Sequence, residues 1–518
     1  MAYIQSYKEQ SWLLPPSIED LIPEDHVCFL IEGLVDAMDY SAFDIKYSGA
    51  GHPAYHPRIL LKVLLMGVLD RVRSSRKLAR HARENVVYMY LSEKLSPDFR
   101  TISDFRKNNH DIVKEAFKHT VTLAKEEGLL DLSHLATDGS KIKANAANKR
   151  ILTKEEMAVL LRFVEGERLQ WAEQDEKEEK EFGELRGYEQ LKEQSKKKVQ
   201  RAAEYYMKQI RQKGSGAHGA IGDKLREAQQ EIEQSDLKKV STTDPESRFM
   251  RNEKGKVELA YNPQLTVDRN GFILANEVSQ DSFDTGQLIP QVLQAEEIIG
   301  VLPEAVQWSF DAGYYEGENI KFLLDKTIDG YISCQESNDE GPYAKSNFPY
   351  DTAKDEYRCP AQKRVVFVGG NYDRVKKKTV RIYRGIECAD GYAQRACTKS
   401  KTGVRRLKVF PYEKERNAMI AKMRMAKAQE TYKLRQQIVE PVFGDIKENK
   451  GMIGFMTRGI RSVRTEFSLV CIARNIKRIW NAQRARTNPF TQPPRGESRS
   501  ERKSVSGSAF LSPFSPTG

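Results

Sequence analysis

The sequence predicts an α/β protein in which a mixed sheet with flanking helices follows an all-α N-terminal region. Three observations favour this class. Apolar residues from Ile59 to Val68 recur at helical spacing. Two strand-like segments each end in an aspartate, at Asp138 and at Asp311. Between them, apolar residues flank the turn Asp268–Gly271, whose Asn-Gly pair is a strong hairpin signal.

The first 125 residues are expected to be mostly helical. The apolar stripe that begins at Ile59 should face a core. Ser74 or Ser75 can cap the helix that follows it. Thr101, with Asp104 three residues later, resembles a weak capping box and predicts the start of another helix.

Positive charge is concentrated in this region. The chain has 84 Lys and Arg against 73 Asp and Glu, a net charge of +11, and residues 58–107 hold 12 of these cations and 5 of the acids. Such a concentration favours binding to a polyanion, with nucleic acid and anionic membrane as the leading classes and a merely solvated basic face as the alternative. The cations near one face of the helix predicted after Ser75 are Arg73, Arg76, Lys77, Arg80 and Arg83.

The chain is expected to be soluble and to reside in a reducing compartment. Its first residues lack the apolar stretch of a secretory signal. The most apolar stretch, Ile59 to Leu69, is too short to span a bilayer and contains Lys62. Six cysteines in 518 residues do not make a disulfide scaffold. We therefore expect a cytoplasmic protein without a membrane partner.

Composition divides the rest of the chain. Residues 152–238 are dominated by Glu, Lys, Gln and Arg, which predicts a solvated helical insertion, broken near the glycines at 214–222, without a core of its own. Residues 340–415 are expected to be a β-rich basic insertion. Both interrupt an α/β domain spanning 126–482, and residues 483–518, rich in Ser, Pro and Gly, are expected to be disordered.

The two strand-end aspartates are candidate metal ligands. Asp138 precedes Gly139 and Asp311 precedes Ala312 and Gly313, small residues that let the backbone turn and leave room for a substrate. Carboxylates at the ends of neighbouring strands can converge on hard divalent cations. A third carboxylate, on a helix crossing the sheet edge, would complete a two-metal phosphoryl-transfer site. Ordinary turn aspartates are the alternative for each taken singly.

A long helix predicted near the C-terminus supplies a third carboxylate. It carries Tyr432, Arg435, Glu440 and Lys447. Positions 440 and 447 are seven residues apart, and therefore on one face of an α-helix. That face would present a metal-binding carboxylate and a cation to a phosphate. A solvated amphipathic helix with chance charges is the alternative.

Taken together, these features make the chain resemble the DDE transposases of bacterial insertion sequences, in the branch whose catalytic helix carries a Tyr-Arg-Glu-Lys signature. The resemblance runs from about residue 10 to 482. It implies a ribonuclease-H-like catalytic domain over 126–482, with 152–238 inserted after the first strand, and a DNA-binding domain over 1–125. The segments that carry it are HPRILLKVLLMGVLDRVRSSRKLARHARENVVYMYLS, PDFRTISDFRK, TDGSKIKANA, YNPQLTVDRNGFILA, FDAGYYEGENI and YKLRQQIVEPVFGDIK.

The resemblance also implies roles for the residues already singled out. Two Mg²⁺ ions, for which Mn²⁺ can substitute, would be held by the catalytic residues. The residues that match this triad are Asp138, Asp311 and Glu440, and those that match its DNA-facing partners are Tyr432, Arg435 and Lys447.

One departure concerns the third member of the triad. The commonest form of the signature has three residues between Arg and Glu, whereas four separate Arg435 from Glu440. Val439 stands at the shorter spacing and cannot bind a metal. Glu448 and Glu466 are rival carboxylates, but neither follows a Tyr and an Arg at the expected spacing.

The activity implied is that of an enzyme that cuts DNA at element ends by metal-dependent hydrolysis and transfers the exposed 3′-hydroxyl into target DNA by transesterification. Its partners would be double-stranded DNA and further copies of the chain on paired ends, at the bacterial nucleoid. One alternative is a transposase-derived DNA-binding protein without transposition activity. Another is a coiled-coil scaffold built on 152–238, which lacks sustained apolar heptads.

The cysteines bear on a second metal. The resemblance suggests a cysteine cluster and structural zinc between the second aspartate and the catalytic glutamate. Cys359, Cys388 and Cys397 lie there, but Gly391 stands where a C-x-x-C partner of Cys388 is expected. Three thiols without a fourth ligand argue against a tetrahedral zinc site.

Overall fold

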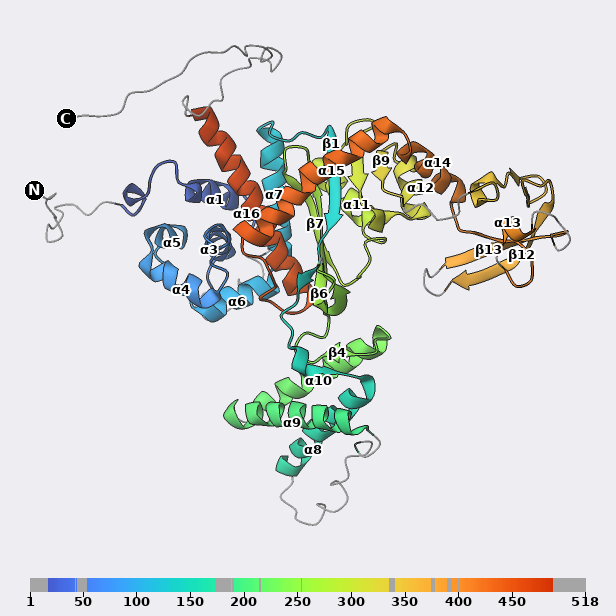
Figure 1. Cartoon of the computed structure of the whole chain (residues 1–518). Coiled ribbons are helices and arrows are strands. Elements are labelled where there is room, and N and C mark those ends of the chain that lie inside the picture. The colour runs from blue at the N-terminus through green and yellow to red at the C-terminus, as the bar shows by residue number, and fades with distance from the viewer. Residues whose placement is uncertain are drawn as a thin grey trace, which may run out of the picture.

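The computed structural model describes residues 17–41, 43, 54–172, 188, 191–213, 216–252, 254–334, 341–373, 378–388, 394–398 and 400–487. Four parts are visible in Figure 1: the N-terminal helices, a central sheet with flanking helices, a helical unit below it and a second sheet at the opposite end from the N-terminal helices. Among the described residues, no helix combines the length and the apolar character needed to cross a bilayer.

The N-terminal part is helical, as its apolar spacing predicts. Nearly every residue of the stripe that begins at Ile59 is buried. The capping-box prediction at Thr101 is wrong, because the helix begins earlier and the Asp98 carboxylate accepts hydrogen bonds from the backbone N–H groups of Arg100 (2.6 Å) and Thr101 (2.9 Å). The helices are α1 (Val27–Asp36), α3 (Pro57–Leu69), α4 (Ser75–Glu84), α5 (Val86–Leu91), α6 (Phe99–Asn108) and α7 (His110–Glu126), after a 3-10 turn at Glu19–Leu21.

The central sheet is mixed. Strand β6 is antiparallel to β1 on one side and to β7 on the other, and β1, β8 and β9 run parallel to one another in that order. The β6–β7 pairing confirms the hairpin predicted around Asp268–Gly271. This strand order is compatible with a ribonuclease-H-like fold. The strands are β1 (His134–Gly139), β6 (Val257–Val267), β7 (Ile273–Ser279), β8 (Gln307–Phe310) and β9 (Asp329–Ile332), with β2 (Ile142–Lys143) and β5 (Arg248–Arg251) on the first half of β6.

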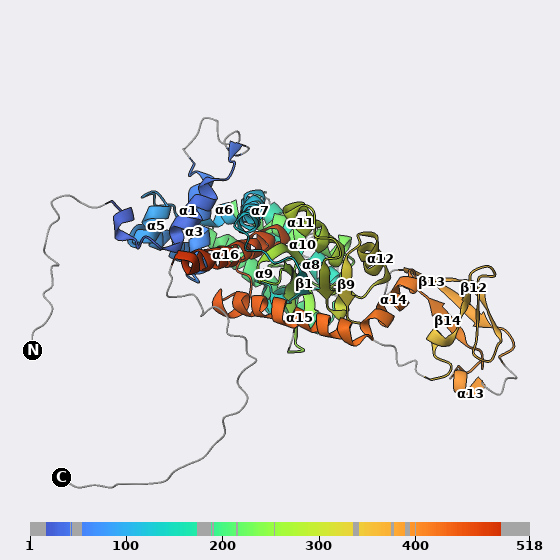
Figure 2. The same ribbon diagram turned by 90° about the horizontal axis from the view of Figure 1, so that it is seen from above.

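Helices cover both faces of this sheet. Helix α15 (Ala426–Gly444) lies along one face and α11 (Leu288–Ile299) along the other (Figure 2). Helix α12 (Gly317–Asp325) links β8 to β9, and α14 (Glu413–Met423) leads into α15. The last helix, α16 (Ile460–Thr487), packs against α3, α7 and β7, so that one continuous hydrophobic core joins the N-terminal helices to the sheet.

The C-terminal boundary differs from the expected one. Residues 483–487, which the composition places in the disordered tail, continue α16 to Thr487. Gln483 explains part of this extension, because its side-chain amide donates a hydrogen bond to Glu127 Oε1 (2.6 Å) at the end of α7. The remainder of the predicted tail, 488–518, lies outside the described residues.

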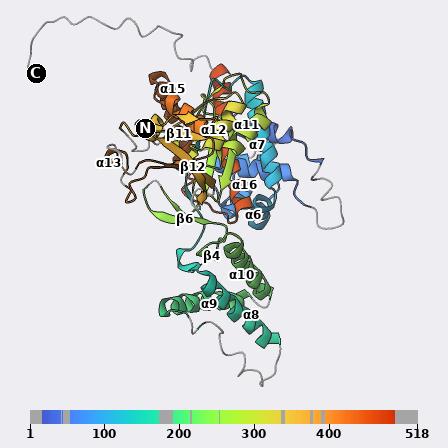
Figure 3. The ribbon, with the colours of Figure 1, turned by 90° about the vertical axis from the view of Figure 1, so that its right-hand side faces the viewer.

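The charged segment after β2 folds into a unit with its own core, which corrects the expectation that 152–238 has none. Leu160, Ile210 and Leu225, one from each helix, are completely buried. The unit projects from the central domain (Figure 3), and a short strand pair closes its base. Its elements are β3 (Ile151–Leu152), α8 (Lys154–Ala172), α9 (Glu193–Lys213), α10 (Gly216–Gln234) and β4 (Val240–Ser241).

A second, antiparallel sheet lies between β9 and α14 in the chain, within the segment predicted to be β-rich. One of its faces packs around Tyr357, Val365, Tyr383 and Leu407, and Cys359 and Cys397 lie against this small core. Its elements are β10 (Tyr350–Asp351), β11 (Glu356–Arg358), β12 (Arg364–Asp373), β13 (Lys378–Gly385), α13 (Gln394–Cys397) and β14 (Arg406–Val409), after a 3-10 turn at Lys345–Asn347.

Candidate active site

The two predicted aspartates lie side by side at the carboxyl ends of two neighbouring strands in the central sheet. Parallel strands β1 and β8 align Thr137 with Phe310, and the next residue of each is Asp138 and Asp311. Buried polar contacts fix this register: Trp308 donates a hydrogen bond to Thr137 Oγ1 (2.8 Å). The sequence therefore predicted both positions correctly, since carboxyl ends of parallel strands meet at one edge.

Burial raises the pKa of both carboxyl groups in this pair. Burial raises the pKa of Asp138 to about 6, and repulsion from Asp311 adds to the rise while Arg435 opposes it. Burial also raises the pKa of Asp311, and the nearby Asp284 carboxylate adds to that rise. Ionised carboxylates crowded in this way are stabilised by a cation. The donor set therefore fits a hard divalent ion, which prefers carboxylate oxygens.

Helix α15 brings a cation to the first aspartate. Its buried face, which includes Ile438, Val439 and Val442, packs on the sheet and on β1 in particular. Arg435 lies on this side, with its Nη1 atom 2.8 Å from Asp138 Oδ2. The Tyr432 ring centroid is 5.9 Å from the guanidinium carbon. Two of the three predicted helix partners therefore lie at the site.

Glu440 does not form a metal-binding cluster with the two aspartates. It is exposed on α15, out of phase with the buried residues Val439 and Val442. Within the part of the chain that the structure describes, no three His, Cys, Asp or Glu side chains are close enough to hold one metal ion. The structure thus brings together two members of the predicted triad.

Lys447 lies beyond the α-helix that carries Glu440. Helix α15 ends at Gly444, and a π-helical turn follows at Asp445–Asn449. Because a π-turn has more residues per turn than an α-helix, the α-helical spacing of seven residues does not apply across this segment. Glu440 is exposed, whereas Lys447 is half-buried.

Sequence reasoning missed a third carboxylate at this edge, Asp284. Its Oδ1 atom accepts hydrogen bonds from Lys141 Nζ (3.0 Å), Asn262 Nδ2 (2.6 Å) and Gln264 Nε2 (2.8 Å). Asp284 follows β7, and β7 runs in the same direction as β1 because both are antiparallel to β6. The carboxyl ends of β1, β7 and β8 therefore share one edge, and the strand-end rule applied to β7 would have pointed to the two acids after it, Asp281 and Asp284.

The small residues after each aspartate make room for Asp284. A Cβ atom at Gly139 would collide with the Gln264 amide and lie 2.8 Å from Asp284 Oδ1. A Cβ atom at Gly313 would lie 3.0 Å from Asp284 Oδ2. The space expected to receive substrate at these positions is thus filled by the Asp284 network. Backbone conformation does not explain these glycines, because neither has a positive φ.

The basic helix of the N-terminal region is α4. Its apolar face buries Leu78, Ala79 and Ala82. The opposite face is open to solvent, and the predicted cations exposed there are Arg76, Lys77, Arg80 and Arg83. Arg76 also lies over the exposed Phe99 ring of α6 (5.1 Å).

Arg73 does not share this face, which corrects its assignment. It precedes α4, its side chain is 10 % exposed, and it donates hydrogen bonds to the backbone oxygens of Gly451 and Gly454 (2.8 Å each). It also pairs with Glu466, the rival third carboxylate. Burial raises the pKa of Glu466, but Arg73 and Arg106 lower it more, so that it lies below its ordinary value. Glu466 is therefore committed to a buried ion-pair cluster away from the aspartates.

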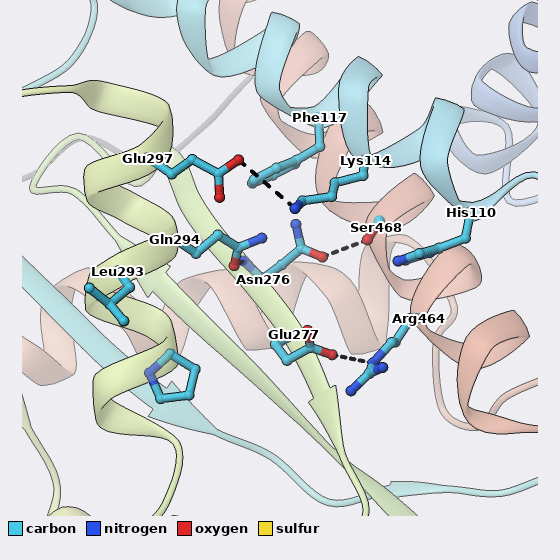
Figure 4. A pocket seen from close by; sticks show the side chains of 11 residues that line it. His110, Lys114, Phe117, Asn276, Glu277, Leu293, Gln294, Glu297, Arg464 and Ser468 are labelled. Carbon is cyan, nitrogen blue, oxygen red and sulfur yellow. Dashed lines mark hydrogen bonds and ion pairs between the residues drawn. The ribbon is translucent and has the colours of Figure 1, made fainter. Parts of the chain in front are cut away.

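A cavity of about 290 Å³ lies elsewhere, among α7, β7, α11 and α16 (Figure 4). Ion pairs between Lys114 and Glu297 (3.9 Å) and between Arg464 and Glu277 lie across it. Neither aspartate and no residue of α15 lines it. It is therefore a separate feature from the candidate active site.

Two segments of the chain match families of known proteins. Residues 358–480 match the family described as "Transposase DDE domain", and residues 16–108 match the family described as "Transposase domain (DUF772)". The first segment contains α15 with Tyr432, Arg435 and Glu440, whereas Asp138 and Asp311 lie outside both. No curated protein matches the chain. The two matches support a transposase of the DDE type.

Proposed function

We propose that this chain is a transposase that cuts DNA at element ends and joins the freed 3′-hydroxyl to target DNA, using Asp138, Asp311 and Glu440. The observation that carries the proposal is the buried pair Asp138 and Asp311 at the ends of adjacent parallel strands, with Arg435 of the matched transposase segment 2.8 Å from the first. Double-stranded DNA is the proposed substrate.

The three carboxylates would hold two Mg²⁺ ions, with Mn²⁺ as a substitute. Ions bound there would activate the attacking hydroxyl and stabilise the leaving oxygen during displacement at phosphorus. Backbone N–H groups of Gly139 and Gly313 orient one oxygen of Asp138 (2.9 Å) and of Asp311 (2.8 Å). The other oxygen of Asp138, Oδ2, is the one that Arg435 contacts.

Arg435 has two roles in this proposal. Without a divalent ion, its guanidinium offsets the charge of Asp138. When an ion takes over that task, Arg435 can bind a phosphate of the DNA, since guanidinium groups form paired hydrogen bonds with phosphate oxygens. Tyr432 supports it through the ring contact of 5.9 Å.

Glu440 would complete the site by a local shift of α15. Pro441 follows it inside the helix and has no backbone N–H, so one hydrogen bond is missing from this turn. The π-helical turn at Asp445–Asn449 begins a few residues later. Both features reduce the resistance of this segment to movement, and the attraction of a bound cation supplies the driving force.

The exposed cations of α4 are proposed to bind the element ends, with Lys447 as a further DNA contact. Long basic side chains along one helix face can follow a phosphate backbone. We also propose that several copies of the chain assemble on paired DNA ends.

Replacing Arg76 and Arg80 by Ala should weaken DNA binding and reduce its dependence on salt. An unchanged salt dependence would remove α4 from the interface.

Cleavage of supercoiled DNA that carries the ends flanking the gene tests the chemistry. With Mg²⁺ or Mn²⁺, we expect Asp138→Ala, Asp311→Ala and Glu440→Ala each to abolish cutting while DNA binding survives. Glu448→Ala, an exposed acid in the next turn, is the matched control and should cut normally. Wild-type protein that binds these ends without cutting them would refute the proposal. Normal cutting by Glu440→Ala alone would refute the choice of third carboxylate.

A further inference from the structure

The second sheet has one packed face and one open face. Alternate residues of a strand point to opposite faces, and residues aligned across an antiparallel pair share a face. Tyr357, Val365, Tyr383 and Leu407 form the packed face together with Phe348. The residues between them therefore point to the other side. The sheet itself lies at the opposite end of the molecule from the N-terminal helices (Figures 1 and 2).

The open face is strongly basic. Arg358 of β11 is aligned with Arg364 of β12, and Arg384 of β13 is aligned with Arg406 of β14. Lys408 is aligned with Ile382 one pair further along. All five cationic side chains are exposed. We call Arg358, Arg364, Arg384, Arg406 and Lys408 the basic face.

The acids on this face do not neutralise it. Glu356 is almost fully buried beneath Arg364, whose Nε donates to its Oε2 (2.8 Å). Asp351 accepts hydrogen bonds from the backbone N–H groups of Ala353 (3.0 Å) and Lys354 (3.3 Å) in its own turn. Among the described residues, the other four cations of the basic face have no carboxylate within ion-pair distance.

The alignment of like charges calls for an external anion. Like charges directly opposite on neighbouring strands destabilise a sheet. On the basic face Arg384 and Arg406 form such a pair. Arg358 and Arg364 are also aligned, but Glu356 offsets the charge of Arg364. A row of phosphates lying across the strands would remove this repulsion. The planar guanidinium group also matches phosphate oxygens in paired hydrogen bonds.

We infer that the basic face binds the phosphate backbone of double-stranded DNA independently of its base sequence. The inference rests on the proposed transposase function for the identity of the polyanion. A protein partner fits less well, because protein interfaces have an apolar core, whereas the apolar residues that share this face are half-buried (Val366 and Ile382) or buried (Val380). The face would add a DNA-binding surface separate from α4 and from the aspartates.

Binding of the full-length chain to a duplex of about 30 base pairs and arbitrary sequence tests the inference. Fluorescence anisotropy would be measured in EDTA over a range of salt concentrations, so that no cutting occurs. The test variant carries Arg358→Gln, Arg384→Gln, Arg406→Gln and Lys408→Gln, and keeps the Arg364–Glu356 pair. We expect weaker binding and a salt slope smaller by about 2 to 4, because each phosphate that the variant no longer neutralises reduces the slope by roughly 0.9.

Two controls make the result specific. A matched variant on the exposed side of α9, with Lys197, Arg201, Arg211 and Lys213 replaced by Gln, removes the same charge and should keep the wild-type slope. The double variant Arg384→Lys and Arg406→Lys keeps both charges and should therefore keep the wild-type salt slope. The melting temperature of the fourfold basic-face variant should equal or exceed the wild-type value, because it relieves repulsion between like charges.

The outcomes that overturn the inference are defined in the same assay. An unchanged salt slope in the basic-face variant, or an equal loss in the α9 variant, would remove this face from DNA binding. If an acidic peptide bound to the basic face and DNA did not displace it, the face would be assigned to a protein partner. Because binding is measured without metal, these results are independent of cutting, which alone tests the proposed chemistry.

Discussion

Asp284 is the residue whose position at the site most needs a functional test. One of its oxygens accepts three hydrogen bonds, from Lys141, Asn262 and Gln264, and its charge raises the pKa of Asp311. It therefore connects the end of β7 to the two aspartates. Its lysine partner marks it as a positioning residue that sets the charge and orientation of its neighbours.

Asp284→Asn should weaken metal binding at the site. The substitution removes a negative charge next to Asp311 and leaves Lys141 without its carboxylate. Substitutions of residues that orient metal ligands typically reduce affinity or activity by about 10- to 100-fold. The concentration of Mg²⁺ that gives half-maximal cutting should rise by a factor in that range. Asp281→Asn, an exposed acid in the same loop, is the control, and equal metal requirements for both variants would exclude a positioning role.

Asp268 gives a pH-dependent prediction that is separate from catalysis. It is fully buried and accepts hydrogen bonds from the backbone N–H groups of Asp131 (2.8 Å) and Phe272 (2.6 Å). Burial nevertheless raises its pKa to about 7. An unfolded aspartate titrates near about 4. Between these values the folded protein retains a proton that the unfolded chain has lost, so this group's contribution to stability falls as pH rises.

Comparison of wild type with Asp268→Asn isolates that contribution. The stability of wild type relative to the variant should decrease from pH 5 to pH 7, by up to about 1.4 kcal/mol for each pH unit. Above the folded pKa the difference should become constant. Denaturant unfolding at a series of pH values measures it. A difference that does not vary with pH would show that Asp268 is ionised throughout.

At the scale of elements, a buried ion cluster joins the N-terminal helices to α16. Glu466 of α16 pairs with Arg73, which precedes α4, and accepts hydrogen bonds from Met456 and Thr457. Arg106 of α6 donates to the Arg73 backbone oxygen (3.0 Å). Arg73 thus links α6 to the Glu466 carboxylate of α16. The sequence pattern placed Arg73 on the DNA-binding face because helical spacing alone cannot reveal such a partner nearly 400 residues away.

Glu466→Gln should destabilise the whole chain. It would leave two buried guanidinium groups without a counter-charge, a change that typically costs about 3–5 kcal/mol. Glu448→Gln, at an exposed position, should change the unfolding free energy by less than about 0.5 kcal/mol. Urea unfolding compares them. Near-equal stabilities would contradict the ion-cluster interpretation, and the expected loss means that failed cutting by a Glu466 variant cannot identify a metal ligand.

At the scale of the whole molecule, the central sheet organises parts that come from distant segments. Strand β1 and strand β8 are separated by the helical unit, β6 and β7, and α15 follows the second sheet. The continuous core from α1 to α16 couples folding of these parts. An ion that binds where they meet should therefore stabilise the whole fold.

Divalent ions should raise the melting temperature through the two aspartates. A ligand present at 100 times its dissociation constant stabilises a folded protein by about 2.7 kcal/mol. Mg²⁺ or Mn²⁺ should give such a shift in wild type and not in the double variant Asp138→Asn and Asp311→Asn, which lacks both carboxylates. Sodium chloride at equal ionic strength is the control. Equal shifts in both proteins would locate ion binding elsewhere.

Local sequence patterns were sufficient to predict a residue's position in the fold where that position depends only on the residue's own segment. The alternation of apolar residues predicted β6, β7 and β8, and the position of Asp138 and Asp311 at strand ends followed from it. The apolar stripe of α3 was predicted in the same way. Helical spacing also predicted the exposed cations of α4, whereas Arg73, which precedes this helix, is largely buried.

The sequence by itself determined the α/β class, the hairpin at Asp268–Gly271 and the two strand-end aspartates, because hydrophobic period and turn chemistry act over a few residues. Only the tertiary structure decided that Asp284 joins them, that 152–238 has a core, and that α15 ends in a π-turn which separates Glu440 from Lys447. These features depend on strand order, side-chain packing and ion pairs between distant segments, which no local period encodes.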